Sequence, residues 1–195
     1  MIGKVDLYDG VNAQLTDDRF GRKSSAISLV NGYYKVPSGV YFYGTEFTIM
    51  VWVKVRNHMV WSRVIDFANI RDNAIFFALS GPNLGYPEFQ IYSSGAPKFD
   101  VQSTIQLQLN TWKHLAFVFL QPNGYIYIDG VSCSSTIVPF ITGPDNVIRT
   151  SNFVGRSNWF PNDPDLNADL DELKIFNRAL TQQEVANEMN NNMFL

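Results

Sequence analysis

The sequence predicts an all-β fold in which two antiparallel sheets pack face to face and one short helix lies near the C-terminus. Three observations predict it. Apolar side chains alternate along Phe47–Val55, short strand-like segments recur between turn signals, and Thr181–Glu184 is a helix-capping sequence. A period of two is typical of a strand with one buried face, and regularly spaced short strands are typical of a sandwich.

The length and composition fit one such domain. The chain has 195 residues, of which 46% are hydrophobic and 17% are charged, and this argues against disorder. We therefore expect a single domain over residues 1–195, which buries about 70% of its unfolded surface and needs no disulfide. The net charge is −3 and the basic residues are scattered, so nucleic acid and an anionic membrane are poor candidates for partners.

Signals for the cellular compartment leave two alternatives open. Residues 1–10 lack the apolar segment of a secretion signal, and no run approaches the ~18 apolar residues of a membrane span, so no membrane insertion is expected. Cys133 is the only cysteine, which excludes a disulfide within the chain, and its neighbours predict an inert thiol. The sequence fits an intracellular protein, or a module excised from a longer secreted protein.

The strands are predicted from alternation and from the turn residues between them. Asn31-Gly32 and Asp129-Gly130 are hairpin-turn dipeptides, whereas residues 1–25 are polar and rich in turn residues. The expected strands are Ala26–Val30, Tyr33–Val36, Phe47–Val55, Arg63–Ala68, Ala74–Ser80, Glu88–Ser93, a segment within Leu107–Phe119, and Tyr125–Ile128. The expected core residues are Phe47, Ile49, Val51, Phe117, Ile126 and Ile128.

One helix is predicted after Thr181. In this capping box the Thr181 hydroxyl accepts a hydrogen bond from the Glu184 amide, and the Glu184 carboxylate reaches back to the start of the helix. Val185 and Met189 then lie on one face. We expect this face to dock on the sandwich; a helix that binds a partner is the alternative.

Four segments, in this order, resemble one family. The block Asn152–Val185 resembles the closing segment of the laminin-G-like, concanavalin A-like jelly rolls. Phe47–Val55, Leu107–Phe119 and Tyr125–Val131 are similar to the family's early tryptophan strand, its W-x-H strand and its Asp-Gly hairpin. The resemblance implies a two-sheet antiparallel jelly-roll sandwich that is a module of a larger extracellular or cell-surface protein. It implies no single function, because lectins, adhesion modules and glycosidases share the fold.

A run of acidic residues is the candidate metal site. Asp163, Asp165, Asn167, Asp169 and Asp171 alternate, so an extended chain would project them to one side, and such hard oxygens suit Ca²⁺. The resemblance implies a structural Ca²⁺ with Asp171 as a ligand, and Asp169 and Asp165 are further candidates. Such an ion would join the terminal strand to the N-terminal segment. A solvated acidic loop with one buried aspartate is the alternative.

No catalytic residues are predicted. The glucanases of this fold carry Glu-x-Asp-x-Glu or Glu-x-Asp-x-x-Glu on one strand, and this chain has neither motif. Glu46, Glu88 and Glu172 are isolated in the sequence, and His58 and His114 have no plausible serine or cysteine partner. We therefore expect a protein that is not an enzyme. A glycoside hydrolase or polysaccharide lyase with a non-standard site is the alternative.

The expected function is non-catalytic recognition of a glycan or a protein surface. Sugars are bound by aromatic faces together with planar polar groups. Trp159 lies among asparagine, proline and aspartate on a predicted loop, which makes it the best candidate for a ligand-binding residue. Arg156, Asn158 and Asn162 lie beside it and are further candidates. The concave face of the sheet is the other place where a ligand could bind. A structural spacer is a third function that the sequence allows.

Overall fold

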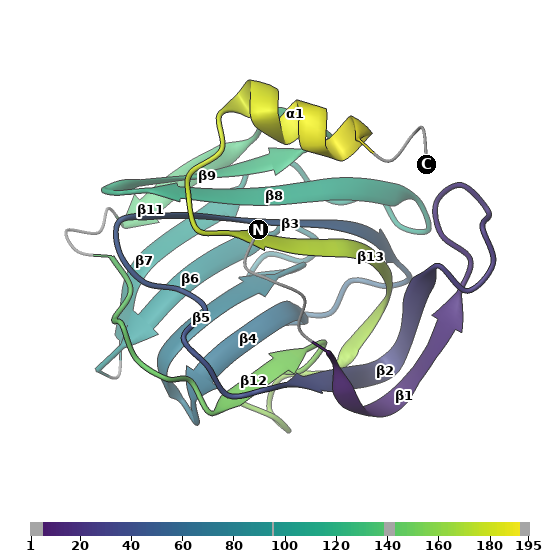
Figure 1. Cartoon of the computed structure of the whole chain (residues 1–195), viewed down its shortest axis with the longest axis horizontal. Coiled ribbons are helices and arrows are strands. Elements are labelled where there is room, and N and C mark those ends of the chain that lie inside the picture. The colour runs from purple at the N-terminus through teal and green to yellow at the C-terminus, as the bar shows by residue number, and fades with distance from the viewer. Residues whose placement is uncertain (1–5, 95, 139–142, 192–195) are drawn as a thin grey trace.

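The computed structural model describes residues 6–94, 96–138 and 143–191 and consists of strands with one helix (Figure 1). The strands are β1 (Tyr8–Thr16), β2 (Ala26–Val36), β3 (Glu46–Val55), β4 (Arg63–Asn69), β5 (Asp72–Ala78), β6 (Glu88–Ser93), β7 (Ala96–Ser103), β8 (Trp112–Leu120), β9 (Asn123–Ile128), β10 (Val131–Ser132), β11 (Ser134–Val138), β12 (Ser151–Val154) and β13 (Leu166–Phe176). The helix α1 spans Gln182–Asn190.

The strands form one antiparallel sheet that curls into two facing layers. Their order is β10-β9-β8-β3-β13-β2-β12-β4-β5-β6-β7-β11, and β1 pairs with β2 outside this path. Figure 1 shows β3, β8 and β13 lying in front of β4, β5, β6 and β7. The predicted all-β sandwich is thereby confirmed. Its two layers are continuous because β2 belongs to both.

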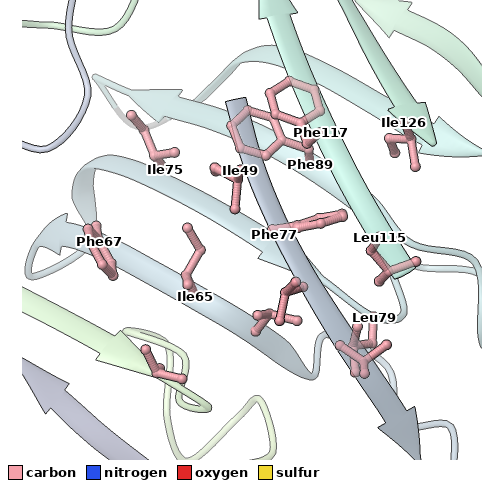
Figure 2. Packing of buried hydrophobic residues seen from close by; sticks show 14 of the residues in the cluster. Ile49, Ile65, Phe67, Ile75, Phe77, Leu79, Phe89, Leu115, Phe117 and Ile126 are labelled. Carbon is pink, nitrogen blue, oxygen red and sulfur yellow. The ribbon is translucent and has the colours of Figure 1, made fainter. Parts of the chain in front are cut away.

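The core lies between the two layers and is rich in aromatic side chains. The six predicted core residues are all buried. Phe117 of β8 stacks on Phe89 of β6 with ring centroids 3.5 Å apart, which joins the layers at the centre of the core (Figure 2). Phe47 and Phe77 also contact this pair. Burial of such rings is the main favourable contribution to folding.

The prediction of a hairpin at Asn31-Gly32 is wrong. The segment is one strand, β2, whose first part pairs with β13 and whose last part pairs with β12. Asn31 has a φ of 51° and bends the strand without reversing it. Gly32 is required for close approach, because a Cβ there would lie 2.4 Å from the backbone oxygen of Asn12 on β1.

The predicted helix and its cap are confirmed. Thr181 Oγ1 accepts a hydrogen bond from the Glu184 amide at 3.2 Å, and the Glu184 carboxylate accepts one from the Thr181 amide at 2.8 Å. Val185 of α1 is fully buried on the outer side of β3, β8 and β9, where it packs in a cluster with Met50 and Tyr127. Within the described residues, no helix is long and apolar enough to cross a membrane.

Candidate functional site

The outer face of β4, β5 and β6 carries a cluster of aromatic side chains. We call Trp61, Phe76, Tyr92 and Trp159 the aromatic face. Trp159 meets Phe76 and Tyr92 edge to face, with ring centroids 6.1 and 5.4 Å apart, and Trp61 meets Phe76 at 6.3 Å. Phe76 is buried, whereas the other three rings are half-buried and keep part of their surface in solvent.

Arg63 lies at the centre of the aromatic face. Its guanidinium carbon is 3.6 Å from the centroid of Phe76 and 5.1 Å from that of Trp159, within the range of a cation–π contact. Its charge is balanced by Asp163 at 2.7 Å and by Asp66 at 3.5 Å. Because the Arg63 side chain is only 4% exposed, it supports the rings from below and is not itself a contact surface.

The loop of residues 155–165 holds Trp159 on the sheet. The Asn158 amide N–H donates to Asp66 Oδ2 at 3.0 Å and its Nδ2 donates to Asp66 Oδ1 at 2.8 Å, so both oxygens of this fully buried carboxylate are bound. Ser151 donates to Asn158 Oδ1 at 2.6 Å. These bonds join the loop to β4 and β12 and thereby determine the position of the next residue, Trp159.

A row of polar side chains continues from the aromatic face across β6 and β7. In the antiparallel register Glu88 faces Gln102 and Gln90 faces Asp100. Gln90 Nε2 donates to Glu88 at 2.6 Å and to Asp100 at 3.2 Å, and Gln102 Nε2 donates to Glu88 at 3.0 Å. The row therefore forms one hydrogen-bonded network beside the rings.

The two carboxyl groups of this row titrate abnormally. Burial, with the nearby charge of Asp100, raises the pKa of Glu88 from 4.5 to about 8. Burial also raises the pKa of Asp100. No lysine or arginine of the described residues forms an ion pair with either group. At neutral pH Glu88 is therefore mostly protonated.

The four predicted ligand residues do not all come together. Trp159 and Asn158 belong to the outer face described above, with Asn158 as an anchor. Arg156 instead points toward Tyr33 of β2, 3.7 Å from its ring, and binds Asp165 through two hydrogen bonds of 2.7 and 2.6 Å. Asn162 is exposed on the same loop. Ligand contact by these residues stays a prediction.

The three predicted metal ligands are each paired with a basic side chain. Asp171 binds Arg19 at 2.6 Å, Asp165 binds Arg156, and Asp169 binds Lys54 at 2.8 Å and also the guanidinium of Arg56. Ca²⁺ requires six to eight oxygen ligands, and these carboxylates are engaged by cations instead. The part of the chain that the structure describes holds no group of three or more His, Cys, Asp or Glu that could bind a metal ion. The side chains as they stand therefore do not fit a calcium site.

Most of the outer face was missed in the sequence. Tyr92, Glu88 and Gln90 lie in the predicted strand Glu88–Ser93 but were not predicted to bind a ligand, and the strand β7 was not predicted. One signal was present: Glu88, Gln90 and Tyr92 alternate with apolar residues, so they project from the face opposite the core. What the sequence did not show is which neighbouring strand lies beside them.

The comparisons agree with the fold. The chain matches the family Laminin_G_3, described as the concanavalin A-like lectin/glucanases superfamily, over residues 29–186. A search among curated proteins finds no match. Among solved structures, the chain is similar to domain 4 of a GH43 extracellular arabinanase from Geobacillus stearothermophilus, determined in complex with arabinotriose. The TM-score is 0.69 with 22% identity, over 95% of this chain and 81% of that one.

Two toxin domains are also similar. The binding domain of Paraclostridial Mosquitocidal Protein 1 has a TM-score of 0.70 and 18% identity, over 96% of this chain and 47% of that one. The botulinum neurotoxin serotype G binding domain has a TM-score of 0.62 and 15% identity, over 94% and 46%. This chain thus spans about half the length of these toxin domains. With the family match over most of its length, the chain belongs to the concanavalin A-like lectin/glucanase superfamily.

Proposed function

We propose that this chain is a non-catalytic module that binds glycan on the outer face of β4–β7, with Trp159 and Tyr92 as stacking surfaces. One observation carries the proposal: three half-buried aromatic rings lie beside a row of carboxamide and carboxyl groups. Sugar rings have apolar faces that stack on aromatic rings and hydroxyls that bind planar polar groups. The arabinanase domain crystallised with arabinotriose supports the choice of a glycan.

The chemistry of the candidate groups favours binding over catalysis. Glu88 and Asp100 are bridged by a single amide nitrogen of Gln90, whereas the carboxyl groups of a glycosidase must be apart to hold the sugar between them. Glu88 is also only 1% exposed. Burial lowers the pKa of His114 to about 4 and raises that of the Cys133 thiol, so neither suits acid–base or nucleophilic work at neutral pH.

Replacing Trp159 by alanine is expected to weaken glycan binding about tenfold or more, because an aromatic stacking surface contributes roughly 1–3 kcal/mol. A glycan array that includes arabino-oligosaccharides identifies a ligand, and isothermal titration calorimetry then measures the affinity of each variant. The matched control is Trp112→Ala, since Trp112 is a half-buried tryptophan at the start of β8 in the other layer.

Three results would contradict this proposal. If Trp159→Ala and Trp112→Ala bind the glycan with the same affinity, the ligand does not stack on the aromatic face. If the protein hydrolyses or cleaves by elimination any polysaccharide of a broad panel, it is an enzyme with a non-standard site. Binding of a protein partner with no glycan bound would place the chain among adhesion modules instead.

The calcium ion implied by the family resemblance is not part of this proposal, because its candidate ligands are paired with basic side chains. The placement in a larger extracellular protein stays a proposal. A bound Ca²⁺ stabilises the folded state by mass action, so EDTA would lower the melting temperature and Asp171→Asn would abolish that response. Because Arg19 already pairs with Asp171, we expect EDTA to leave the melting temperature unchanged, and Asp171→Asn and Arg19→Met to lower it alike. Elemental analysis of the purified protein provides the independent measurement of bound metal.

A further inference from the structure

A hollow borders the outer face of β4–β7. It is formed by Asn83 and Tyr86 of the loop between β5 and β6 and by Gln102 and Thr104 around the end of β7, and its volume is about 660 Å³. Gln102 joins the hollow to the polar row: its Nε2 donates to Glu88 at 3.0 Å, and its Oε1 accepts from the exposed Asn83 at 2.8 Å. The hollow and the aromatic face are therefore connected through side chains of β6 and β7.

The spacing of the two regions sets the size of a ligand that contacts both. Glu88, beside the hollow, and Tyr92, on the aromatic face, stand near the two ends of β6. They are separated by four residues, which at a rise of about 3.3 Å per residue is roughly 13 Å. This distance exceeds the width of one sugar ring. A single monosaccharide cannot contact both regions, whereas an extended oligosaccharide can.

The charge at the hollow limits the chemistry of the ligand. Of the carboxyl groups on this outer face, Asp66 and Asp163 each form an ion pair with Arg63. Glu88 and Asp100, at the end near the hollow, form no ion pair within the described residues, so no cation neutralises the carboxyl group of Asp100. An anionic sugar in the hollow would meet this charge, and like charges brought together at an interface cost affinity. Carboxamides such as Asn83 and Gln102 instead both donate to and accept from neutral hydroxyls.

We infer, on the basis of the proposed glycan binding, that the ligand is an extended oligosaccharide of uncharged sugars that occupies two subsites. One sugar stacks on Trp159 and Tyr92, and another binds Asn83 and Gln102 in the hollow. The polar row of β6 and β7 lies between them. Acidic glycans, whether uronic, sulfated or sialylated, are excluded from the hollow by the unpaired charge of its neighbour Asp100.

The test is titration calorimetry with defined saccharides. The probes are the neutral trisaccharides arabinotriose, xylotriose, cellotriose and maltotriose, their monosaccharides, and trigalacturonic acid. At least one neutral trisaccharide is expected to bind tenfold or more tightly than its monosaccharide and than trigalacturonic acid. Asn83→Ala is expected to weaken trisaccharide binding roughly three- to tenfold, the loss of about one hydrogen bond, and to leave monosaccharide binding unchanged. Asn123→Ala, at the exposed start of β9, is the matched control.

The outcomes separate this inference from the function on which it rests. If Trp159→Ala weakens saccharide binding and Asn83→Ala behaves as Asn123→Ala does, the aromatic subsite stands and the hollow is not a subsite. If trigalacturonic acid binds as tightly as the neutral trisaccharides, the inferred charge selection is wrong. If Trp159→Ala changes no saccharide affinity, the proposed function itself fails.

Discussion

Replacing Arg63 by methionine is expected to lower the free energy of unfolding by about 3–5 kcal/mol, the usual cost of removing one partner of a buried ion pair. The reason is that Asp66 is fully buried and would lose its neighbouring cation, while Asp163 would lose a 2.7 Å ion pair. The rings of Phe76 and Trp159 would also lose the guanidinium against which they pack. Urea unfolding followed by tryptophan fluorescence measures the effect.

Two variants make the Arg63 experiment specific. Lys23→Met removes an exposed ion pair with Asp17 and is expected to change stability by less than about 1 kcal/mol. The double variant Arg63→Met/Asp66→Asn removes both buried charges and is expected to regain part of the loss, because the fully buried carboxylate of Asp66 is no longer left unpaired. The recovery is only partial because Asp163 still lacks its partner. If Arg63→Met is as stable as Lys23→Met, the buried ion pair does not stabilise the fold.

The stability of the protein is expected to decrease as the pH rises from about 5 to above 8, because Glu88 titrates differently in the two states. Its pKa is about 8 in the folded protein, against an ordinary value of 4.5. Between these values the folded state holds a proton that the unfolded chain has released, so the free energy of unfolding falls by up to ~1.4 kcal/mol per pH unit. This contribution is complete below the unfolded pKa and is lost as pH passes the folded pKa.

Glu88→Gln isolates this effect, since glutamine keeps the shape and the acceptor oxygen but carries no proton to lose. The measurement is the melting temperature of both proteins between pH 5 and 9. We expect the melting temperature of the variant to rise relative to that of the parent protein as the pH increases. Above pH 8 the variant should be the more stable of the two. His114, whose pKa is lowered to about 4, adds stability above its ordinary value of 6.5 and loses it toward pH 4. That contribution is present in both proteins and cancels in the difference.

The groups around Glu88 provide a second check. Asp100 on β7, which faces Gln90, is the charged group that raises the pKa of Glu88. Gln90 and Gln102 donate hydrogen bonds to Glu88, and its cross-strand neighbour on β5 is Ala78. Asp100→Asn removes the repulsion and brings the folded-state pKa of Glu88 closer to 4.5, so the loss of stability should end at a lower pH and be smaller. A constant difference in melting temperature between Glu88→Gln and the parent protein at every pH would contradict the assignment.

The elements that the sequence determined are those specified by neighbours along the chain. Alternation along Phe47–Val55 depends on the two-residue period of a strand, and the face of β3 that lies in the core is the one that the alternation predicts. Met50 on the opposite face is buried as well, because α1 covers it, and the alternation did not predict this. The capping box at Thr181–Glu184 needs only residues three positions apart, and both of its hydrogen bonds are present. The resemblance of Asn152–Val185 to one family also rests on residues that are neighbours along the chain.

The tertiary structure decided what depends on partners far away in the chain. Asn31-Gly32 has the composition of a hairpin turn, yet pairing with β1, β12 and β13 keeps β2 extended, and Gly32 serves close packing against β1. Local propensity there yields to long-range hydrogen bonding, as is common in sheets.

The outer face was decided in the same way. Nothing local in the sequence specifies the register between β6 and β7, and this register brings Glu88, which is isolated in the sequence, into one network with Asp100. Trp159 meets Phe76 and Tyr92 because Asn158 ties its loop to the buried carboxylate of Asp66, a contact across 92 positions of the chain. Sequence spacing therefore identified Trp159 as a single residue, whereas only the pairing of distant strands assembled the surface to which it belongs.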